Sequence, residues 1–367
     1  MMPEIIINNQ VYEVEGILND RYSSDDPLFL EINQFCKWWY SDETHMKIHT
    51  SGSTGTPKLI RISRSQMTLS AKQTIGFFNL QPGDSLLLCL NPRYIGGKMM
   101  LVRAFSHQMK LIAVTPSVNP FTSLNLNIGL DFMACTPQQL STILSDENNI
   151  LCLNQMKGII VGGAPVSQIL KKELQNIETP VYATYGMTET VSHVALKRLN
   201  GNQPSDCYTG LGDVVFDQDE RGCLTIIAGV TNRHRIVTND RVDLLSPTQF
   251  RWLGREDNVI NSGGIKLQVE QLEDKMSDIF IENNFHNRFF LFPLPDEILG
   301  QKLCLAIESE RLNKGIVFNF LEKGLLKYEK PKSVYAIYKF YETGSGKIDR
   351  NSMIADIQKG LIKSELP

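Results

Sequence analysis

The sequence lacks the features that mark membrane and secreted proteins. No apolar run approaches the ~20 residues needed to span a bilayer, because stretches such as 85–90 are cut short by Asn91 and Pro92. The first residues are acidic and polar and include no basic stretch before a long apolar run, so a secretory signal is not expected. These absences predict a soluble, cytoplasmic protein without a membrane span.

The cysteines, the histidines and the net charge do not indicate a particular binding partner. The seven cysteines include no C-x-x-C pair and the six histidines have no metal-ligand spacing, which argues against a disulfide framework and a zinc site. Lys and Arg number 37 against 40 Asp and Glu, for a net charge of −3. Such a balance directs no strong field at nucleic acid. We expect small-molecule partners and no nucleic acid, and the sequence leaves a homo-oligomer open.

What is present is the composition of an ordinary globular protein. The chain has 367 residues, 42% hydrophobic and 21% charged, enough for two or three folding units. Residues 86–186 alternate strand-like apolar runs with amphipathic segments, which predicts helices around a mostly parallel sheet. Shorter β-like pieces follow residue 201. The predicted fold class is α/β: a large N-terminal layered α/β domain with a small β-barrel-like part, residues 1–256, and a small mobile α+β C-terminal domain, residues 257–367.

Residues 50–58 read T-S-G-S-T-G-T-P-K and follow a predicted strand end at 46–49. Small hydroxyl residues and glycines allow backbone N–H groups and hydroxyls to converge on an anion, and the lysine adds a positive charge. The spacing does not match G-x-x-x-x-G-K-[ST], which disfavours a Walker-type NTPase. Taken alone the segment could equally be a flexible surface loop. The candidate phosphate ligands are Thr50, Ser51, Gly52, Ser53, Thr54, Gly55 and Lys58.

Four further motifs follow in order along the chain. They read Y-G-M-T-E-T at 185–190, T-N-D at 238–240, G-R-E-D-N at 254–258 with S-G-G at 262–264, and G-S-G-K-I-D-R at 344–350. Together with the loop at 50–58, their order and spread resemble the adenylate-forming superfamily of acyl- and aryl-CoA synthetases, luciferases and carrier-loading adenylation domains. One departure is Asn239, which stands where the family usually has glycine.

The resemblance implies a two-step reaction that uses ATP, Mg²⁺ and CoA. A carboxylate attacks the α-phosphate of ATP and expels pyrophosphate, and a thiol then cleaves the acyl-adenylate. Since the first step brings two anions together, it requires cations and donors that are already in position. By resemblance, Lys347 bridges the carboxylate and the α-phosphate, Thr188 donates to that phosphate, and Glu189 binds Mg²⁺, a metal that usually takes one or two carboxylates.

The resemblance also assigns the nucleotide site, a hinge and a thiol channel. Asp257 is the implied hinge, about which the C-terminal domain would turn between the half-reactions. Ser262, Gly263 and Gly264 would form the channel for the thiol, although a plain β-turn would equally tolerate two glycines. The implied adenine and ribose ligands are Gly162, Gly163, Ala164, Pro165, Tyr185, Gly186, Asp240 and Arg255, of which Asp240 could instead be an ordinary turn residue and Arg255 a surface ion-pair partner.

Residues 96–105 and 255–264 resemble the 2-succinylbenzoate-CoA ligases of menaquinone synthesis more than fatty acyl-CoA synthetases. A dicarboxylate substrate carries a second anionic group, which needs a cation or several donors when buried. The acid-pocket candidates are Tyr94, Gly97, Lys98, Arg103, Ser192 and His193. As alternatives, Lys98 and Arg103 could be charges on a helix surface, and Ser192 could satisfy only local backbone.

The sequence therefore predicts an AMP-forming acid–CoA ligase acting on an aromatic carboxylic acid, with 2-succinylbenzoate as the expected substrate. Two alternatives remain: a stand-alone adenylation protein that loads a carrier protein, and a nucleotide-binding regulator without catalysis. Only 49 residues precede the loop at 50–58, fewer than in most relatives. We therefore expect a shortened first layer of the large domain with every catalytic motif downstream of it.

Overall fold

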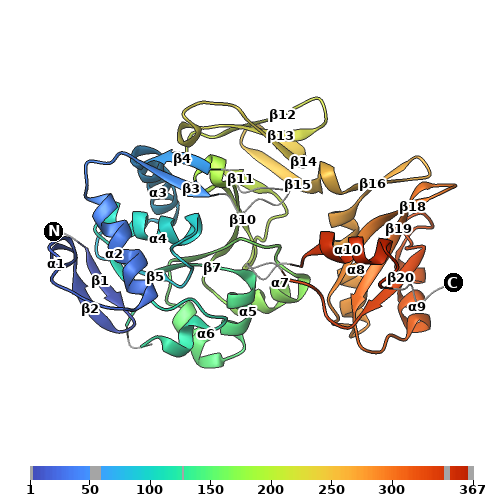
Figure 1. Ribbon diagram of the computed structural model, residues 1–367, viewed down its shortest axis with the longest axis horizontal. Coiled ribbons are helices and arrows are strands. Elements are labelled where there is room, and N and C mark those ends of the chain that lie inside the picture. The colour runs from blue at the N-terminus through green and yellow to red at the C-terminus, as the bar shows by residue number, and fades with distance from the viewer. Residues whose placement is uncertain (1–2, 50–58, 126–127, 343–347, 363–367) are drawn as a thin grey trace. The chain divides into compact units, whose positions relative to one another are not determined.

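The computed structural model describes residues 3–49, 59–125, 128–342 and 348–362 (Figure 1). The chain divides into two compact units. Unit 1 consists of Met1–Gln218, Thr225–Val237 and Leu244–Arg251, and unit 2 of Asp219–Leu224, Thr238–Asp243 and Trp252–Pro367.

Five parallel strands form the centre of unit 1. In the sheet they stand in the order β6 (Lys110–Ala113), β5 (Ser85–Leu88), β7 (Phe132–Cys135), β8 (Gly158–Val161) and β9 (Val181–Gly186). All four residues of β7 and of β8 are buried. Near-continuous apolar runs of this kind are typical of parallel strands that are covered on both faces, so the central sheet agrees with the sequence pattern.

Helices cover the two faces of these strands (Figure 1). On one face lie α2 (Pro27–Trp39), α3 (Arg64–Phe78) and α4 (Ile95–Ser106), and on the other α5 (Pro137–Leu144), α6 (Glu147–Leu153) and α7 (Gln168–Glu173). Alternate strand residues therefore meet different helices: Phe132 packs on Phe78 of α3, whereas Met133 shares a core with Leu140 of α5. Capping boxes at Ser63 and Thr136 fix the starts of α3 and α5.

The N-terminal segment adds one edge to this sheet. Strand β1 (Glu4–Ile7) pairs in parallel with β6, and β2 (Gln10–Glu13) pairs with β1. Helix α1 (Val14–Leu18) follows, and Asp26 caps α2 by accepting a hydrogen bond from the backbone N–H of Leu28. A separate antiparallel pair consists of β3 (His45–His49) and β4 (Leu59–Ser63).

Beyond β9 the sheet continues in the order β9-β10-β11-β15-β14-β13-β12, and the pairs β9–β10, β10–β11 and β11–β15 are antiparallel. These strands are β10 (His193–Arg198), β11 (Tyr208–Gly210), β12 (Val215–Gln218), β13 (Cys223–Ile227), β14 (Ile236–Ser246) and β15 (Gln249–Arg255). The backbone N–H of Phe216 in β12 donates to the Pro247 carbonyl, 2.8 Å away, so β12 returns to the turn after β14. The predicted barrel-like part is this curled end of the sheet, and the pieces around 236 and 244 are one strand.

The bulk of unit 2 is a second α+β layer structure. Its sheet has the order β17 (Ile265–Gln268), β16 (Val259–Ser262), β19 (Gly300–Glu308), β18 (Phe289–Asp296), with β20 (Ser333–Ile337) parallel to β19. Helices α8 (Val269–Glu282) and α9 (Lys314–Gly324) share one core with this sheet, and α10 (Arg350–Gln358) packs in another. The predicted fold class is thereby confirmed.

Short 3-10 turns complete the assignment: η1 (Pro120–Ser123), η2 (Leu174–Asn176), η3 (Thr188–Thr190), η4 (Gly229–Thr231) and η5 (Glu256–Asn258). Among the helices of the described residues, none is both long and apolar enough to cross a bilayer.

Candidate functional site

Two of the predicted motifs fall outside the described residues. These are the phosphate loop, with Thr50, Ser51, Gly52, Ser53, Thr54, Gly55 and Lys58, and the catalytic Lys347. Their described flanks are well anchored. Strands β3 and β4 pair up to His49 and Leu59. On either side of 343–347, Glu342 and Ile348 form an antiparallel bridge, and Arg350 makes two hydrogen bonds of 2.9 and 3.0 Å to the carboxylate of Glu273.

The adenine candidates of unit 1 follow two neighbouring strands. Gly162, Gly163, Ala164 and Pro165 come directly after β8, whereas Tyr185 and Gly186 end β9. Since β8 and β9 are adjacent and parallel, both groups reach the carboxyl-end edge of the sheet, where open α/β sheets bind ligands. The Tyr185 ring is 9% exposed and packs edge-on against Phe250, with ring centroids 5.0 Å apart.

Short-range hydrogen bonds fix the segment that follows β9. The Thr190 hydroxyl accepts from the backbone N–H of Met187 at 2.9 Å and lies 2.7 Å from the Ser192 carbonyl oxygen, to which it can donate. Ser192 N–H donates to the Thr190 carbonyl at 2.8 Å across Val191, whose φ and ψ are 67° and −56°. This is a γ-turn of the rare, strained type, held by a β-branched residue. The strain sits between Glu189 and His193, as is common at functional sites.

Glu189 is exposed and has no hydrogen bond or ion pair with another described residue, and neighbouring Thr188 is half-buried. Among the described residues no cluster of three or more His, Cys, Asp or Glu side chains could hold a metal ion by itself. Mg²⁺ that arrives on a nucleotide usually needs only one or two protein carboxylates because phosphate oxygens and water complete its shell. A free carboxylate at Glu189 fits that requirement.

The acid-pocket candidates separate into two groups. Gly97 lies in the first turn of α4, where an added Cβ would stand 2.5 Å from the Asn91 carbonyl oxygen, so only glycine permits this approach. Tyr94, just before α4, is 58% exposed. Lys98 donates to the Pro92 carbonyl at 2.8 Å and lies 5.8 Å from the Phe35 ring of α2. Burial lowers the pKa of Lys98, whereas Glu31 of α2 opposes the shift.

The second group meets in the core. Arg103 is 1% exposed, and its guanidinium donates to Thr74 Oγ1 at 3.3 Å and to Met100 Sδ at 3.4 Å. His193 Nε2 lies 3.0 Å from the same Thr74 oxygen and shares a hydrogen bond with it. Ser192 adjoins this cluster, with its Oγ 3.4 Å from His193 Nδ1. The alternative that Arg103 is a surface charge is therefore wrong.

The charge of Arg103 has no counterion within this cluster. No carboxylate of the described residues lies within ion-pair distance of it, and its Nε has no hydrogen-bond partner there. Burial lowers the pKa of Arg103 to about 9, so the group stays charged at neutral pH. Burial and the nearby Arg103 charge lower the pKa of His193 to about 3, which keeps that imidazole neutral. The result is a buried, uncompensated cation beside a neutral donor–acceptor ring.

Unit 2 brings the ribose and hinge candidates together. Asp240 is 9% exposed and accepts from Trp252 Nε1 at 3.2 Å, and its Oδ1 lies 3.9 Å from Arg255 Nη1. Arg255 also donates to Asp257 at 2.6 Å. Asn239, which departs from the usual glycine, donates from Nδ2 to the same carboxylate, 3.2 Å away. Its link to Asp257 was not predicted, because the motif identified position 239 only as a departure.

The thiol-channel candidates form a hairpin turn. Ser262 pairs with Ile265 between β16 and β17, so Gly263 and Gly264 are the two connecting residues, with φ of 60° and 83°. Positive φ at both positions is the requirement of a tight two-residue hairpin. The backbone therefore matches the plain-turn alternative, and any role in thiol passage is a proposal.

Comparison with known proteins agrees with this geometry. A family model described as "AMP-binding enzyme" matches residues 10–219, more than half of the chain. The chain belongs to the AMP-binding enzyme family. A solved acyl-CoA synthetase (AMP-forming)/AMP-acid ligase II-like protein from Dyadobacter fermentans is 38% identical, with a TM-score of 0.62, and the match covers 92% of this chain and 97% of that one.

Curated relatives carry a narrower name. The 2-succinylbenzoate–CoA ligases of Bacillus cytotoxicus and Haemophilus influenzae are 22% and 24% identical, and each match covers 83% of this chain and 69% of the relative. The o-succinylbenzoate CoA synthetase of Bacillus subtilis, solved with its acyl-adenylate intermediate, shares the fold at 19% identity, with a TM-score of 0.70 over 84% of this chain and 68% of that one. The predicted enzyme class, an AMP-forming CoA ligase, is confirmed by the family and by these ligases.

Proposed function

We propose that this AMP-binding enzyme is an ATP-dependent 2-succinylbenzoate–CoA ligase of menaquinone synthesis. The observation that carries the proposal is the buried Arg103, which has no carboxylate partner among the described residues. An isolated buried charge is costly unless a partner neutralises it. A substrate with two carboxylates can present one to the reaction and the other to Arg103.

The acid would be recognised by the cluster on α3, α4 and β10. Arg103 can hold a carboxylate through parallel N–H donors, the geometry that favours arginine over lysine. Neutral His193 and Thr74 supply further hydrogen-bonding groups without a competing charge. One turn before Thr74 on α3, the buried Ser70 hydroxyl also lacks a partner in the described structure. Lys98 makes its described contacts with Pro92 and α2 instead, so we assign it no contact with the acid.

The nucleotide would be held by the motif residues in the roles that the family resemblance implies. Residues 162–165 and Tyr185 would flank the adenine, Asp240 and Arg255 would bind ribose, and Glu189 would hold Mg²⁺ on the phosphates. The magnesium supplies charge neutralisation at the phosphoryl group. In the first step a substrate carboxylate oxygen bonds to the α-phosphorus as pyrophosphate leaves, with Lys347 and Thr188 as donors. In the second, the CoA thiol attacks the acyl carbonyl and AMP leaves.

The test is a substrate panel with the purified chain, ATP, Mg²⁺ and CoA. 2-Succinylbenzoate should give its CoA thioester and AMP in equal amounts and faster than benzoate or fatty acids. Preference for a monocarboxylate would refute the substrate assignment. Acid-dependent exchange of pyrophosphate into ATP with little turnover of free CoA would instead support the carrier-loading alternative, and failure to turn over or exchange any acid would support the regulator.

A further inference from the structure

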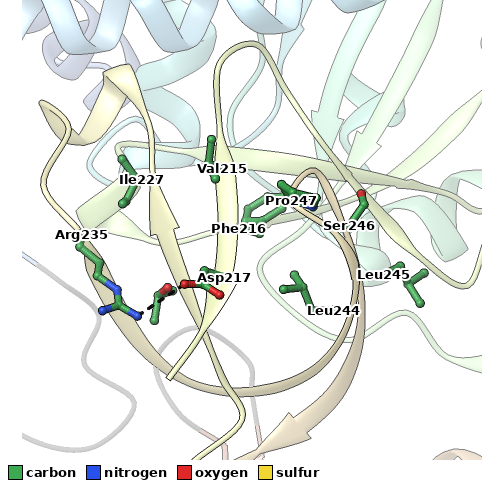
Figure 2. A pocket seen from close by; sticks show the side chains of 10 residues that line it. Val215, Phe216, Asp217, Ile227, Arg235, Leu244, Leu245, Ser246 and Pro247 are labelled. Atoms are coloured by element: carbon green, nitrogen blue, oxygen red, sulfur yellow. Dashed lines mark ion pairs between the residues drawn. The ribbon is translucent and has the colours of Figure 1, made fainter. Parts of the chain in front are cut away.

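The curled end of the sheet in unit 1 contains a pocket that none of the predicted site residues lines. The pocket is open to solvent on one side and has a volume of about 510 Å³ among β12, β13, β14 and the turn that follows β14 (Figure 2). Its walls are largely apolar, with Val215, Ile227, Leu244, Leu245 and Pro247 among the lining residues. A volume of this size is in the range of sites for small molecules.

The strand pattern explains why the pocket has this lining. Side chains two residues apart share a face of a strand, so Val215 and Asp217 project from one face of β12, and Thr225 and Ile227 from one face of β13. The hydrogen bond between Phe216 N–H and the Pro247 carbonyl brings β12 back to the turn after β14. The pocket therefore lies at the curled end of the sheet, bordered by β12, β13, β14 and the turn after β14.

Two polar groups in the pocket are poorly satisfied by the protein. The Arg235 guanidinium lies 4.0 Å from the Asp217 carboxylate, and both side chains are at least half exposed. Figure 2 marks this ion pair with a dashed line. Arg235 has no hydrogen bond to any described residue. An exposed ion pair such as Arg235–Asp217 contributes little to the stability of the fold. Thr225 is 1% exposed, and its hydroxyl oxygen has no hydrogen-bond partner in the described structure.

We propose that this pocket binds a small amphipathic carboxylate at a site separate from the acid pocket of the ligase reaction. The hydrocarbon body would cover the apolar walls, and the carboxylate would take the N–H donors of Arg235, whose planar fork matches a carboxylate. Asp217 is the more exposed partner, with 71% of its side chain accessible, so it can turn to water when the ligand carboxylate replaces it.

Calorimetric titration of the full chain without ATP or CoA tests the site. Decanoate is the probe, decanol the neutral analogue and decyltrimethylammonium the cationic one. Decanoate should bind, and Arg235→Gln should weaken it about tenfold, the effect of one charge-assisted contact near solvent. Decanol should bind more weakly and be indifferent to Arg235→Gln. Arg233→Gln is the matched control, since Arg233 pairs with Asp213 and does not line the pocket.

A second variant tests whether a change of fold, and not the loss of a contact, causes the weaker decanoate binding. Val215 is 44% exposed, so Val215→Asp adds a repelling charge to the wall without emptying the core, and it should reduce decanoate affinity at least as much. If neither Arg235→Gln nor Val215→Asp weakens decanoate binding, the ligand binds at another site, such as the acid pocket, and the proposal is overturned. Preference for the cationic probe would overturn it as well, because Asp217 would then be the ligand group.

Discussion

Replacing Arg103 with methionine should separate recognition of the acid from stability of the fold. Burial lowers the pKa of Arg103 to about 9, and one pKa unit corresponds to about 1.4 kcal/mol. The lowered folded-state pKa means that the folded protein disfavours the charged form. This charge therefore opposes folding in full at every pH below about 9, and less as the pH rises from there toward the higher pKa of the unfolded chain. Methionine fills similar space without the charge, and we expect the free energy of unfolding to rise by about 1–3 kcal/mol.

Arg103→Met should also lower kcat/KM for dicarboxylate substrates but not for monocarboxylates. Removing one member of a buried ion pair costs about 3–5 kcal/mol, so kcat/KM for 2-succinylbenzoate should fall about 10²–10⁴-fold. For 4-oxo-4-phenylbutanoate, which lacks the benzoate carboxylate, the change should stay within about fivefold.

Coupled AMP-release kinetics and urea denaturation measure the two effects. The control is Arg93→Met, because Arg93 is an exposed arginine that pairs with Glu31. Equal losses of kcat/KM for both acids, or a marked loss of stability, would refute the role given to Arg103.

Three further predictions concern the surroundings of the site. Val191 and Val194 are both 1% exposed, so Val194→Gly is a matched control for Val191→Gly. In urea denaturation, Val191→Gly should lower the free energy of unfolding by at least about 1 kcal/mol less than Val194→Gly, because glycine relieves the backbone strain at φ 67°. Gly97→Ala should lower the melting temperature and ligase activity through its backbone clash, whereas Gly96→Ala, whose nearest contact is 3.4 Å away, should be neutral or stabilising. His193 has a pKa near 3 in the folded protein, so between pH 6 and 4 it binds a proton only when the chain unfolds. The free energy of unfolding should therefore fall by about 1.4 kcal/mol per pH unit in this range, and His193→Gln should remove this component.

The central sheet could be predicted because its strands are short, nearly continuous apolar runs separated by amphipathic helices. The curled end was harder to predict. β14 carries Asn239 and Asp240 in its middle, which resembles a turn in the sequence, yet the strand continues from Ile236 to Ser246. Strand pairing supplies the backbone partners that local preference for a turn would otherwise take.

The charged and polar acid-pocket candidates were chosen because a buried dicarboxylate needs cations or donors, but their grouping required the fold. Arg103 and His193 are far apart in sequence and meet only because Thr74 of α3 stands between them. Lys98 shares the helix of Arg103, yet it points to α2, since positions five apart do not share a helix face. The strain at Val191 has no sequence signal, because valine is the residue least expected at positive φ.

The most direct test of the ligase chemistry follows one oxygen atom. The purified chain is supplied with 2-succinylbenzoate labelled with ¹⁸O in both carboxylates, together with ATP, Mg²⁺ and CoA, and the nucleotide product is weighed by mass spectrometry. An acyl-adenylate pathway transfers one labelled oxygen to the phosphate of AMP, so AMP should gain about 2 mass units per turnover. Label in inorganic phosphate with ADP as product, or unlabelled AMP alongside thioester, would contradict the account.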